Sequence, residues 1–298
     1  MSLEELQRKI KTTDDLREIV STMKALSSAS ILQYEHANKS LNIYQNNLRD
    51  AFHALVKQSN FSQITQKKFS TDNYLVLLIG SNNGMVGKFN RELLQAAETD
   101  LRHQHISPQQ TVFLPIGKRM VMQLQQNKLK MQASYPVANS VKEVSSLAEN
   151  IILQIDAAIT KLKITHVIMW FHQRGKRGMV EITKTNLMPF DSTKIAHYKN
   201  TPWETNNIPL IANNPKMLFS ALLRESLMIS VSRALNLSLA AEHYTRMTNM
   251  QNAEKNIDEN LAELDQKYQQ IRQEEITDEL IDIISGAEAL KKNREKND

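Results

Sequence analysis

Cysteine is absent from all 298 residues of the chain. This absence excludes disulfide frameworks, zinc sites built from thiolates, redox switches and cysteine nucleophiles. Long apolar runs are missing too, because no window approaches the roughly 20 apolar residues that a membrane-spanning helix needs. The N-terminus carries charges from Glu4 onward and lacks the apolar region of a signal peptide. We therefore expect a cytoplasmic protein without a membrane span.

The charge of the chain is unevenly distributed. The net charge is +5, yet residues 240–298 hold 14 acidic against 8 basic side chains, so the basic excess lies upstream. It forms no stripe of arginine and lysine interleaved with aromatic residues, which nucleic-acid-binding domains usually show. With 41% hydrophobic and 23% charged residues, the composition is that of a globular protein. We do not expect nucleic acid to be a partner.

Glycine and proline are absent from long parts of the chain. Neither occurs before Gly80, all seven prolines lie between Pro108 and Pro215, and only Gly286 follows. Because these residues mark turns and break helices and strands, they concentrate where elements are short. The distribution predicts helical ends around a middle region of short elements.

The N-terminal segment has the 3.5-residue apolar repeat of a coiled-coil seam. The repeat is clearest at Tyr34, Ala37, Leu41, Tyr44, Leu48, Ala51 and Leu55, and extrapolates back through Ser30, Ser27, Met23, Val20 and Leu16. Thr13 or Asp14 is expected to cap the helix or interrupt it.

The C-terminal segment has a second seam. Its members are Met250, Ile257, Leu261, Leu264, Tyr268 and Ile271, after which the pattern shifts to Ile276, Leu280, Ile283 and Ala287. At about 1.5 Å per residue, helices over residues 3–58 and 216–290 would measure about 80 and 110 Å. We expect an antiparallel pair of helices acting as a shaft, with the C-terminal helix extending past its partner. The alternative is a long hairpin inside a larger bundle, but the sequence offers no further helices to cover it.

The middle region alternates between strand and helix patterns. Strands are predicted at residues 73–79, 111–117 and 165–173, and helices at 89–105, 118–127 and 140–161. This alternation is typical of a mostly parallel α/β sheet. Residues 173–178 are expected to form a turn into an antiparallel strand within residues 179–190, and residues 200–215 a connector. The predicted domains are residues 1–70, 71–210 and 211–298.

One glycine-rich stretch, GSNNGMVGKFN at residues 80–90, resembles a phosphate-binding loop. A P-loop requires G-x-x-x-x-G-K-[ST]. Gly87 and Lys88 fit this pattern, but Asn82 replaces its first glycine and Phe89 its hydroxyl residue. The dinucleotide motif G-x-G-x-x-G also fails at Asn82. We favour a structural strand-to-helix turn over nucleotide binding.

No other pattern points to catalysis. His103 and His105 have no carboxylates nearby that would complete a metal site, and we expect a solvated helix end there. An acidic cluster is expected to divide between helix faces as solvated surface or a partner contact. Its members are Glu274, Glu275, Asp278, Glu279 and Asp282. No catalytic residue, cofactor or metal ion is predicted.

Three separated motifs resemble those of the gamma subunit of F-type ATP synthases. KIKTTDDLREIVSTMKALSSAS shares Ile10, Ile19, Met23 and Lys24 with the family's N-terminal motif. SNNGMVGKFN is similar to S-x-x-G-x-x-G-x-F-N at Ser81, Gly84, Gly87, Phe89 and Asn90. RMTNMQNAEKN and RQEEITDELIDIISGAEAL resemble the two C-terminal motifs. The last match retains Arg272, Gln273, Ile276, Thr277, Glu279, Gly286, Ala287, Ala289 and Leu290.

The resemblance implies a fold and a set of partners. The fold would be a long antiparallel coiled coil with a Rossmann-like α/β middle domain. The function would be that of a non-catalytic rotor shaft, peripheral at the cytoplasmic face of the cell membrane, which couples ATP synthesis to H⁺ or Na⁺ transport. Its partners would be the alpha and beta subunits of the catalytic head, the epsilon subunit and the membrane c-ring.

The resemblance also implies roles for individual residues. Contacts to the head are expected at Met23, Lys24, Arg272, Gln273, Thr277 and Glu279. An apolar bearing would receive Ile281, Ile283, Ile284 and Leu290. Gly84 and Gly87 would shape the turn, with Lys88 facing solvent or a neighbouring subunit. The charged tail at residues 291–298 continues beyond the usual ending of the family, and we hypothesise that it projects beyond the bearing.

The sequence also departs from the family pattern. The departures are Ser27, Ser28, Ser30, Val86 and Gln269, and they indicate a divergent branch. Other readings are a free-standing coiled-coil scaffold with an α/β ligand-binding domain, and a nucleotide-binding enzyme built on residues 80–90. A further alternative is the central stalk subunit of archaeal and vacuolar-type ATPases, which is also a long helical hairpin. It lacks a comparable α/β middle domain, so the alternating middle region argues against it.

Overall fold

The computed structural model describes residues 2–58, 72–175, 178–190, 197–203, 207–211 and 214–294, with side chains described up to Gly286. The chain divides into two compact units, Met1–Leu26 with Met247–Asp298, and Ser27–Arg246. This division cuts both long helices, whereas the predicted three domains follow chain order and remain a prediction. Among the described residues, none of the helices combines the length and apolar character that crossing a bilayer requires.

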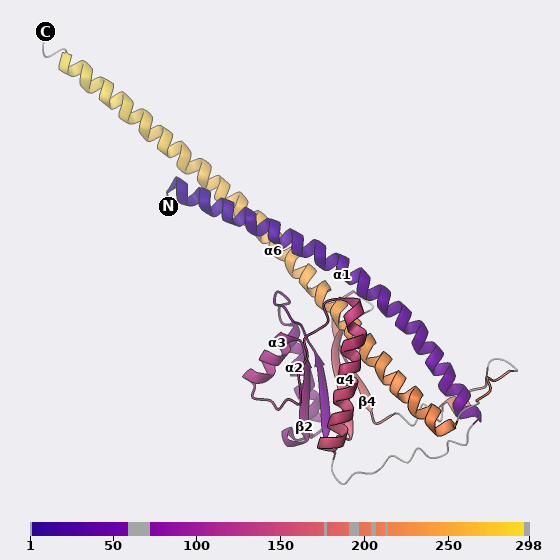
Figure 1. Cartoon of the computed structure of the whole chain (residues 1–298). Helices are drawn as coiled ribbons and strands as arrows, with labels where there is room; N and C mark the ends of the chain where they lie inside the picture. The colour runs from indigo at the N-terminus through magenta and orange to yellow at the C-terminus, as the bar shows by residue number, and fades with distance from the viewer. Residues whose placement is uncertain are drawn as a thin grey trace. The chain divides into compact units, whose positions relative to one another are not determined.

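Helices form both ends of the chain, and a mixed sheet forms the middle (Figure 1). The elements are α1 (Leu3–Gln58), β1 (Tyr74–Ile79), α2 (Phe89–His103), η1 (Pro108–Gln110), β2 (Thr111–Ile116), α3 (Lys118–Gln126), α4 (Val141–Leu162), β3 (His166–Arg174), β4 (Val180–Met188) and α6 (Pro215–Arg294). Every helix and strand expected from the sequence is present, with ends shifted by a few residues. The predicted fold of helical ends and a central α/β sheet is confirmed.

The sheet of the larger unit has the strand order β2-β1-β3-β4. Strands β1, β2 and β3 run parallel, and β4 pairs antiparallel with β3, as the glycine-containing turn predicted. Strand β1 lies in the middle of the parallel part and is apolar on both faces, because helices cover both. Leu75, Leu77 and Ile79 pack against α4 and α6, and Val76 and Leu78 pack against α2 and α3.

Helices α1 and α6 also pack together within this unit. The ring of Tyr34 on α1 stacks on that of His243 on α6, with centroids 5.7 Å apart. Of the predicted seam, Ser27, Tyr34, Leu48 and Leu55 are buried. The prediction is wrong for Tyr44, which is 43% exposed and whose hydroxyl donates to the carboxylate of Glu225 at 3.0 Å.

The smaller unit pairs the two ends of the chain. The C-terminal seam is confirmed, because all six of its members before residue 272 are buried or half-buried. Arg17 and Asp258 form an ion pair at 2.7 Å, and the Gln7 amide donates to the Tyr268 hydroxyl at 2.8 Å. In the part of α1 that belongs to this unit, Leu6 is completely buried, whereas Leu16 is 49% exposed, contrary to the extrapolated seam.

The break predicted at Thr13 or Asp14 is also wrong. Helix α1 runs without interruption from Leu3 to Gln58. The Thr13 hydroxyl donates to the carbonyl of Lys9 at 2.8 Å. Its polar group is therefore satisfied inside the helix and does not cap a new one.

Candidate functional site

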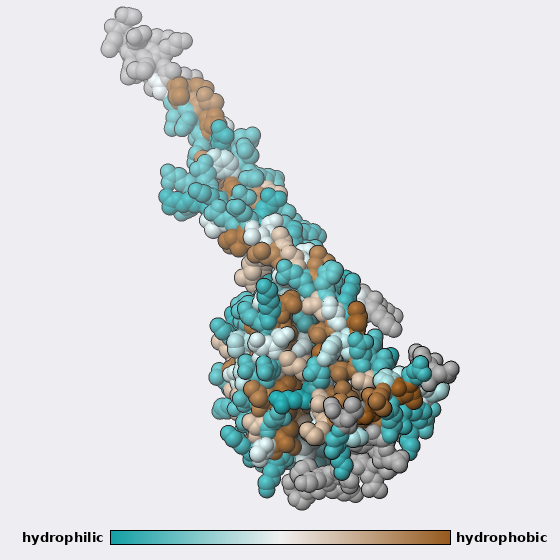
Figure 2. Space-filling model, turned by 45° about the vertical axis from the view of Figure 1, so that its right-hand side comes forward, coloured by the Kyte–Doolittle hydropathy of each residue, from teal (hydrophilic) through white to brown (hydrophobic). Residues whose placement is uncertain are grey.

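The end of α6 is an extended exposed surface. Every residue from Arg272 to Gly286 is exposed. The apolar side chains there are 48% to 68% exposed, at Ile276, Leu280, Ile281, Ile283 and Ile284. The predicted shift of the seam to Ile276, Leu280 and Ile283 thus finds no packing partner in the described part of the unit. Figure 2 shows apolar side chains along this end of the helix, next to the grey residues. Leu290 and Ala287 lie outside the residues whose side chains are described.

This end of α6 has two chemically different faces. At about 100° per residue, Ile276, Leu280, Ile283 and Ile284 fall within about 100° of arc, whereas Ile281 lies about 60° outside that arc, next to the acidic side. The five acidic residues of the predicted cluster fall within about 140° on the opposite side. The expectation that they divide between faces is therefore wrong, because an uninterrupted helix brings them together. The surface has an apolar face and an acidic one.

The predicted polar head contacts occupy different positions around α6. Gln273 lies within the arc of the apolar face and Thr277 beside it, and the Thr277 hydroxyl donates to the Gln273 carbonyl at 2.7 Å. Arg272 and Glu279 lie on the other flank, where the acidic face begins. All four are exposed, so each is available to a partner. Their role stays a prediction.

Met23 and Lys24, predicted to contact the head from α1, differ in their surroundings. The ammonium of Lys24 is hydrogen-bonded to the carboxylate of Glu254 on α6. This hydrogen bond holds the pKa of Glu254 below its ordinary value of 4.5. Met23 is half-buried. In this chain the charge of Lys24 is thus already matched by a partner on the neighbouring helix.

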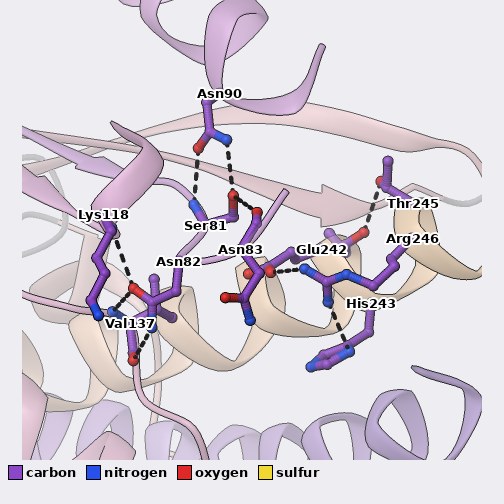
Figure 3. Close-up of polar contacts among 11 residues, drawn as sticks. Ser81, Asn82, Asn83, Asn90, Lys118, Val137, Glu242, His243, Thr245 and Arg246 are labelled. Atoms are coloured by element: carbon purple, nitrogen blue, oxygen red, sulfur yellow. Dashed lines mark hydrogen bonds and ion pairs between the residues drawn. The ribbon is translucent and has the colours of Figure 1, made fainter. Parts of the chain in front are cut away.

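A network of asparagine and serine side chains holds the loop at residues 80–90 (Figure 3). The Ser81 N–H donates to Asn90 Oδ1 at 2.9 Å, and Asn90 Nδ2 donates back to Ser81 Oγ at 2.9 Å. Asn82 Oδ1 accepts from the Val137 N–H at 2.9 Å, and its Nδ2 donates to the Val137 carbonyl at 2.8 Å. The Asn82 side chain is therefore engaged in pairing two loops. These bonds explain asparagine where a P-loop would have glycine.

The glycines of this region have unequal roles. Gly87 has φ of +56°, a left-handed conformation that glycine adopts at little cost, as predicted. Gly84 does not need to be glycine, because an added Cβ would meet only the guanidinium of Arg119, at 3.4 Å. Close packing instead requires Gly80, whose added Cβ would lie 2.7 Å from Met120 Cβ. It also requires Gly117, with φ of +110° and the Ser81 carbonyl oxygen at 2.7 Å.

Helix α6 covers the edge of the sheet where a ligand would bind. In open α/β sheets, ligands occupy the crevice at the carboxyl ends of parallel strands. Here Ser238 of α6 donates from Oγ to the carbonyl of Ile79, the last residue of β1, at 3.1 Å. Ala241 is completely buried against Val86 and Phe89. Lys88 points to solvent and is exposed, as expected. The loop is a packing element under α6.

Other polar groups of the described chain form no metal site. His103 and His105 are exposed at the end of α2. No group of three or more potential ligands lies together among the described residues. Glu242 and Arg246 form a buried ion pair at 2.5 Å on α6, with side chains only 6% and 7% exposed. Burial raises the pKa of Glu242, and Arg246 opposes that rise.

Comparison with known proteins covers nearly the entire chain. The model of a family described as ATP synthase matches residues 2–290. The chain belongs to this family. Two curated relatives are each called ATP synthase gamma chain. The one from Bdellovibrio bacteriovorus is 27% identical, and the one from Geobacter metallireducens 26%. Each alignment covers 97% of this chain and 99% of the relative.

Solved structures of ATP synthase rotors share the fold. The rotor of the Euglena gracilis mitochondrial ATP synthase superposes with a TM-score of 0.65 at 12% identity, covering 92% of this chain and 98% of that one. The central stalk of the Tetrahymena thermophila mitochondrial enzyme gives a TM-score of 0.55 at 16% identity, over 79% and 99% of the two chains. At these identities the likeness concerns the fold alone.

Sequence reasoning missed several residues that shape this ATP synthase family member. Glu254 was not singled out, although it lies in the motif RMTNMQNAEKN that carried part of the resemblance. Gly80 and Gly117 were not distinguished from other turn glycines. Ser238 and Ala241 belong to the stretch LSLAAE, whose small residues signal a close approach between α6 and another element.

Proposed function

We propose that this chain is the central rotor shaft of an F-type ATP synthase, which transmits torque between the membrane ion-driven ring and the catalytic head. The observation that carries the proposal is the exposed two-faced end of α6, in a chain that matches the ATP synthase family over residues 2–290. The chain itself performs no catalysis. Its partners are the alpha and beta subunits, the epsilon subunit and the c-ring, and it is peripheral at the cytoplasmic face of the membrane.

A shaft acts by making unequal contacts. When it touches three chemically equivalent sites differently, it stabilises a different conformation at each one. Every 1.4 kcal/mol of difference in contact free energy changes the relative affinity of a site about tenfold. Turning the shaft then exchanges these affinities among the sites. Bond making and breaking remain with the partner subunits.

The two faces of the α6 end suit different parts of this task. Ile281, Ile283, Ile284 and Leu290 enter an apolar bearing, where non-directional contact changes little with angle. Arg272, Gln273, Thr277 and Glu279 make directional polar contacts to the head. Met23 makes its contact from α1, and Lys24 supports it while paired with Glu254. The predicted domain division, residues 1–70, 71–210 and 211–298, separates the shaft from the part that meets the ring.

Co-purification tests this function. The chain is co-expressed with catalytic-head and ring subunits from the same genome, and an affinity tag on the chain is used to isolate the complex. Substituting Ile283→Asp buries a charge in the bearing, so recovery of head subunits should fall at least about tenfold, equivalent to 1.4 kcal/mol. Asp282→Asn, one residue away on the acidic face, is the matched control and should assemble normally. A wild-type chain that stays monomeric beside these subunits would refute the rotor function.

The alternative is a free-standing coiled-coil scaffold with a ligand-binding α/β domain. It requires a ligand, which a rotor shaft does not. Isothermal titration of the isolated chain with ATP and with NAD should show no binding, since α6 covers the carboxyl end of β1. Saturable binding of either nucleotide would favour the scaffold or an enzyme.

A further inference from the structure

The contact between α6 and the loop at residues 80–90 is small but fully buried. We call it the α6 joint and define it by Ile79, Val86 and Phe89 on the sheet side and Ser238 and Ala241 on the helix side. Val86 and Phe89 are each 3% exposed, Ser238 is 1% exposed and Ala241 is completely buried. Val180 at the start of β4 packs against the same cluster.

The joint combines two kinds of contact. The hydrogen bond from Ser238 fixes α6 against the backbone of β1 at one point. Beside it, the missing side-chain bulk of Ala241 lets the helix approach Val86 and Phe89. The ring of Phe89 is supported from behind by His172 of β3, with centroids 3.8 Å apart. Close-packed interiors have low compressibility and transmit strain, so such a contact resists sliding.

Arg174 provides a second link between the sheet and the helices. It is the last residue of β3, and its Nη1 donates to the carboxylate of Glu35 on α1 at 3.3 Å. Its guanidinium carbon lies 4.9 Å from the centroid of the Tyr244 ring on α6. One side chain therefore touches both long helices. Since the side chains of Arg174 and Glu35 are 45% and 40% exposed, the ion pair adds little to the free energy of folding. Its main effect is to orient α1 relative to β3.

We infer that torque passes between the α/β domain and the paired helices through the α6 joint, next to the packing of α6 on Leu75, Leu77 and Ile79, with Arg174 as a positioning residue that keeps both helices aligned with β3. The inference rests on the proposed rotor function. Torque applied to the α/β domain must cross to α1 or α6 through contacts that resist shear. The joint meets this need because its hydrogen bond and its apolar packing act on one continuous helix.

The test weakens the joint without removing it. Val86→Ala together with Phe89→Leu loosens the packing against Ala241. The matched control, Val76→Ala together with Phe113→Leu, makes the same chemical changes in the cluster on the face of the sheet that packs against α2 and α3. Each variant is assembled into the whole complex and reconstituted in vesicles. Two rates are measured, ATP hydrolysis and ATP-driven ion uptake, with H⁺ and Na⁺ each followed.

The expected result is a fall of about twofold in ions moved per ATP hydrolysed for the joint variant, since loosened packing loses rigidity before it loses the fold. The control should keep the wild-type ratio. An unchanged ratio in the joint variant, or an equal fall in the control, would overturn the inference while leaving the rotor function intact. A wild-type chain that assembles with no partner would overturn both.

A second pair of variants covers the case in which the joint variant fails to fold. Arg174→Glu places two carboxylates face to face at an exposed position and should lower the same ratio with little effect on thermal unfolding. Adding Glu35→Arg restores opposite charges and should recover most of the loss. If Arg174→Glu leaves the ratio unchanged, or the double substitution fails to recover it, Arg174 has no positioning role.

Discussion

Lys24 on α1 and Glu254 on α6 form an ion pair that ties the N-terminal helix to its partner within the smaller unit. The resemblance to gamma subunits had placed Lys24 at an external contact. The pair gives the lysine a partner within the chain, and its contact with the head stays a prediction. The two residues should therefore behave as one unit in mutational experiments.

Lys24→Gln and Glu254→Gln, singly and together, test this coupling. Each single substitution should lower the melting temperature of the helical unit, followed by circular dichroism. The double substitution should lower the melting temperature no more than one single substitution does, because each single substitution already removes the whole interaction. The losses should shrink at 1 M salt, where the screening length is about 3 Å. Lys9→Gln, on an exposed lysine of the same helix, is the control, and fully additive losses would contradict the pairing.

The pair also predicts a dependence on pH. Because Lys24 lowers the pKa of Glu254 in the folded chain, the stabilisation is complete above the ordinary value of 4.5. It is lost as the pH falls through the lowered folded-state pKa, when the carboxylate takes up a proton. Glu254→Gln should thus be less stable than the parent chain at neutral pH, and the two stabilities should converge in acid. Thermal unfolding at several pH values measures this difference.

Glycine substitutions should separate the two kinds of glycine around the loop. Gly80→Ala and Gly117→Ala force overlaps at 2.3 Å with Asn90 Oδ1 and 2.7 Å with the Ser81 carbonyl. Each should lower the free energy of unfolding by about 2 kcal/mol or more. Gly84→Ala meets only a flexible arginine and should change it by less than about 1 kcal/mol. Urea unfolding of the three variants measures this order, and a larger loss for Gly84→Ala would show that the loop is packed differently.

The elements of this chain follow from its sequence because their signals are local. Glycine and proline are absent from residues 1–79, which hold the long helix α1, and the apolar run Tyr74–Ile79 is bounded by Asn73 and by Gly80. The ends of helices differ from the predicted ones where the backbone conformation of a single residue terminates the helix. Helix α2 ends at His103 and not at the expected residue 105, because His105 adopts a left-handed φ of +55°.

The seam of α1 shows what a repeat cannot decide alone. The repeat correctly gave one series with a spacing of seven residues, in which Ser27, Tyr34, Leu48 and Leu55 are buried and Leu41 is half-buried. The second series of the seam was predicted on the side of α1 that holds Leu16 and Tyr44, which are exposed. The side chains buried instead are Ile31 and Phe52, four residues after Ser27 and Leu48. Apolar residues occur on both flanks, so only the placement of α6 selects between them.

The role of the loop at residues 80–90 was predictable in part. Failure of the P-loop and dinucleotide patterns correctly pointed to a structural turn. That α6 closes the crevice above it could not be foreseen, because the bond between Ser238 and Ile79 joins residues 159 positions apart. The acidic face of α6 was predictable from the sequence, because a helix over residues 216–290 was expected and, at about 100° per residue, the five acidic residues fall within about 140° of it.

His172 should make stability depend on acid. Burial lowers its pKa to about 4 from 6.5, and its Nδ1 has no hydrogen-bond partner among the described residues. Between these values the unfolded chain binds the proton more readily, so stability is complete above pH 6.5 and is lost as the pH falls towards 4. His172→Phe keeps the stack on Phe89 and should reduce this loss by about 3 kcal/mol.

Urea unfolding between pH 7 and pH 4 measures the effect of His172→Phe against the parent. Burial and the charge of Arg246 also lower the pKa of His243 to about 4. The variant should therefore still lose some stability in acid. His103→Gln at an exposed position is the control and should keep the full dependence. Parallel stability curves for His172→Phe and the parent would mean that His172 takes up a proton as readily in the folded chain as in the unfolded one.

The buried pair of Glu242 and Arg246 should cost more to break than to remove. Glu242→Met or Arg246→Met alone leaves a partner without its counter-charge in a site less than 10% exposed, and each should cost about 3–5 kcal/mol. Replacing both by methionine removes the burden of two desolvated charges and should cost less than either single change. Equilibrium urea unfolding gives the three values. If the double substitution instead costs the sum of the singles, the two side chains act independently, and the contact between them carries no coupling energy.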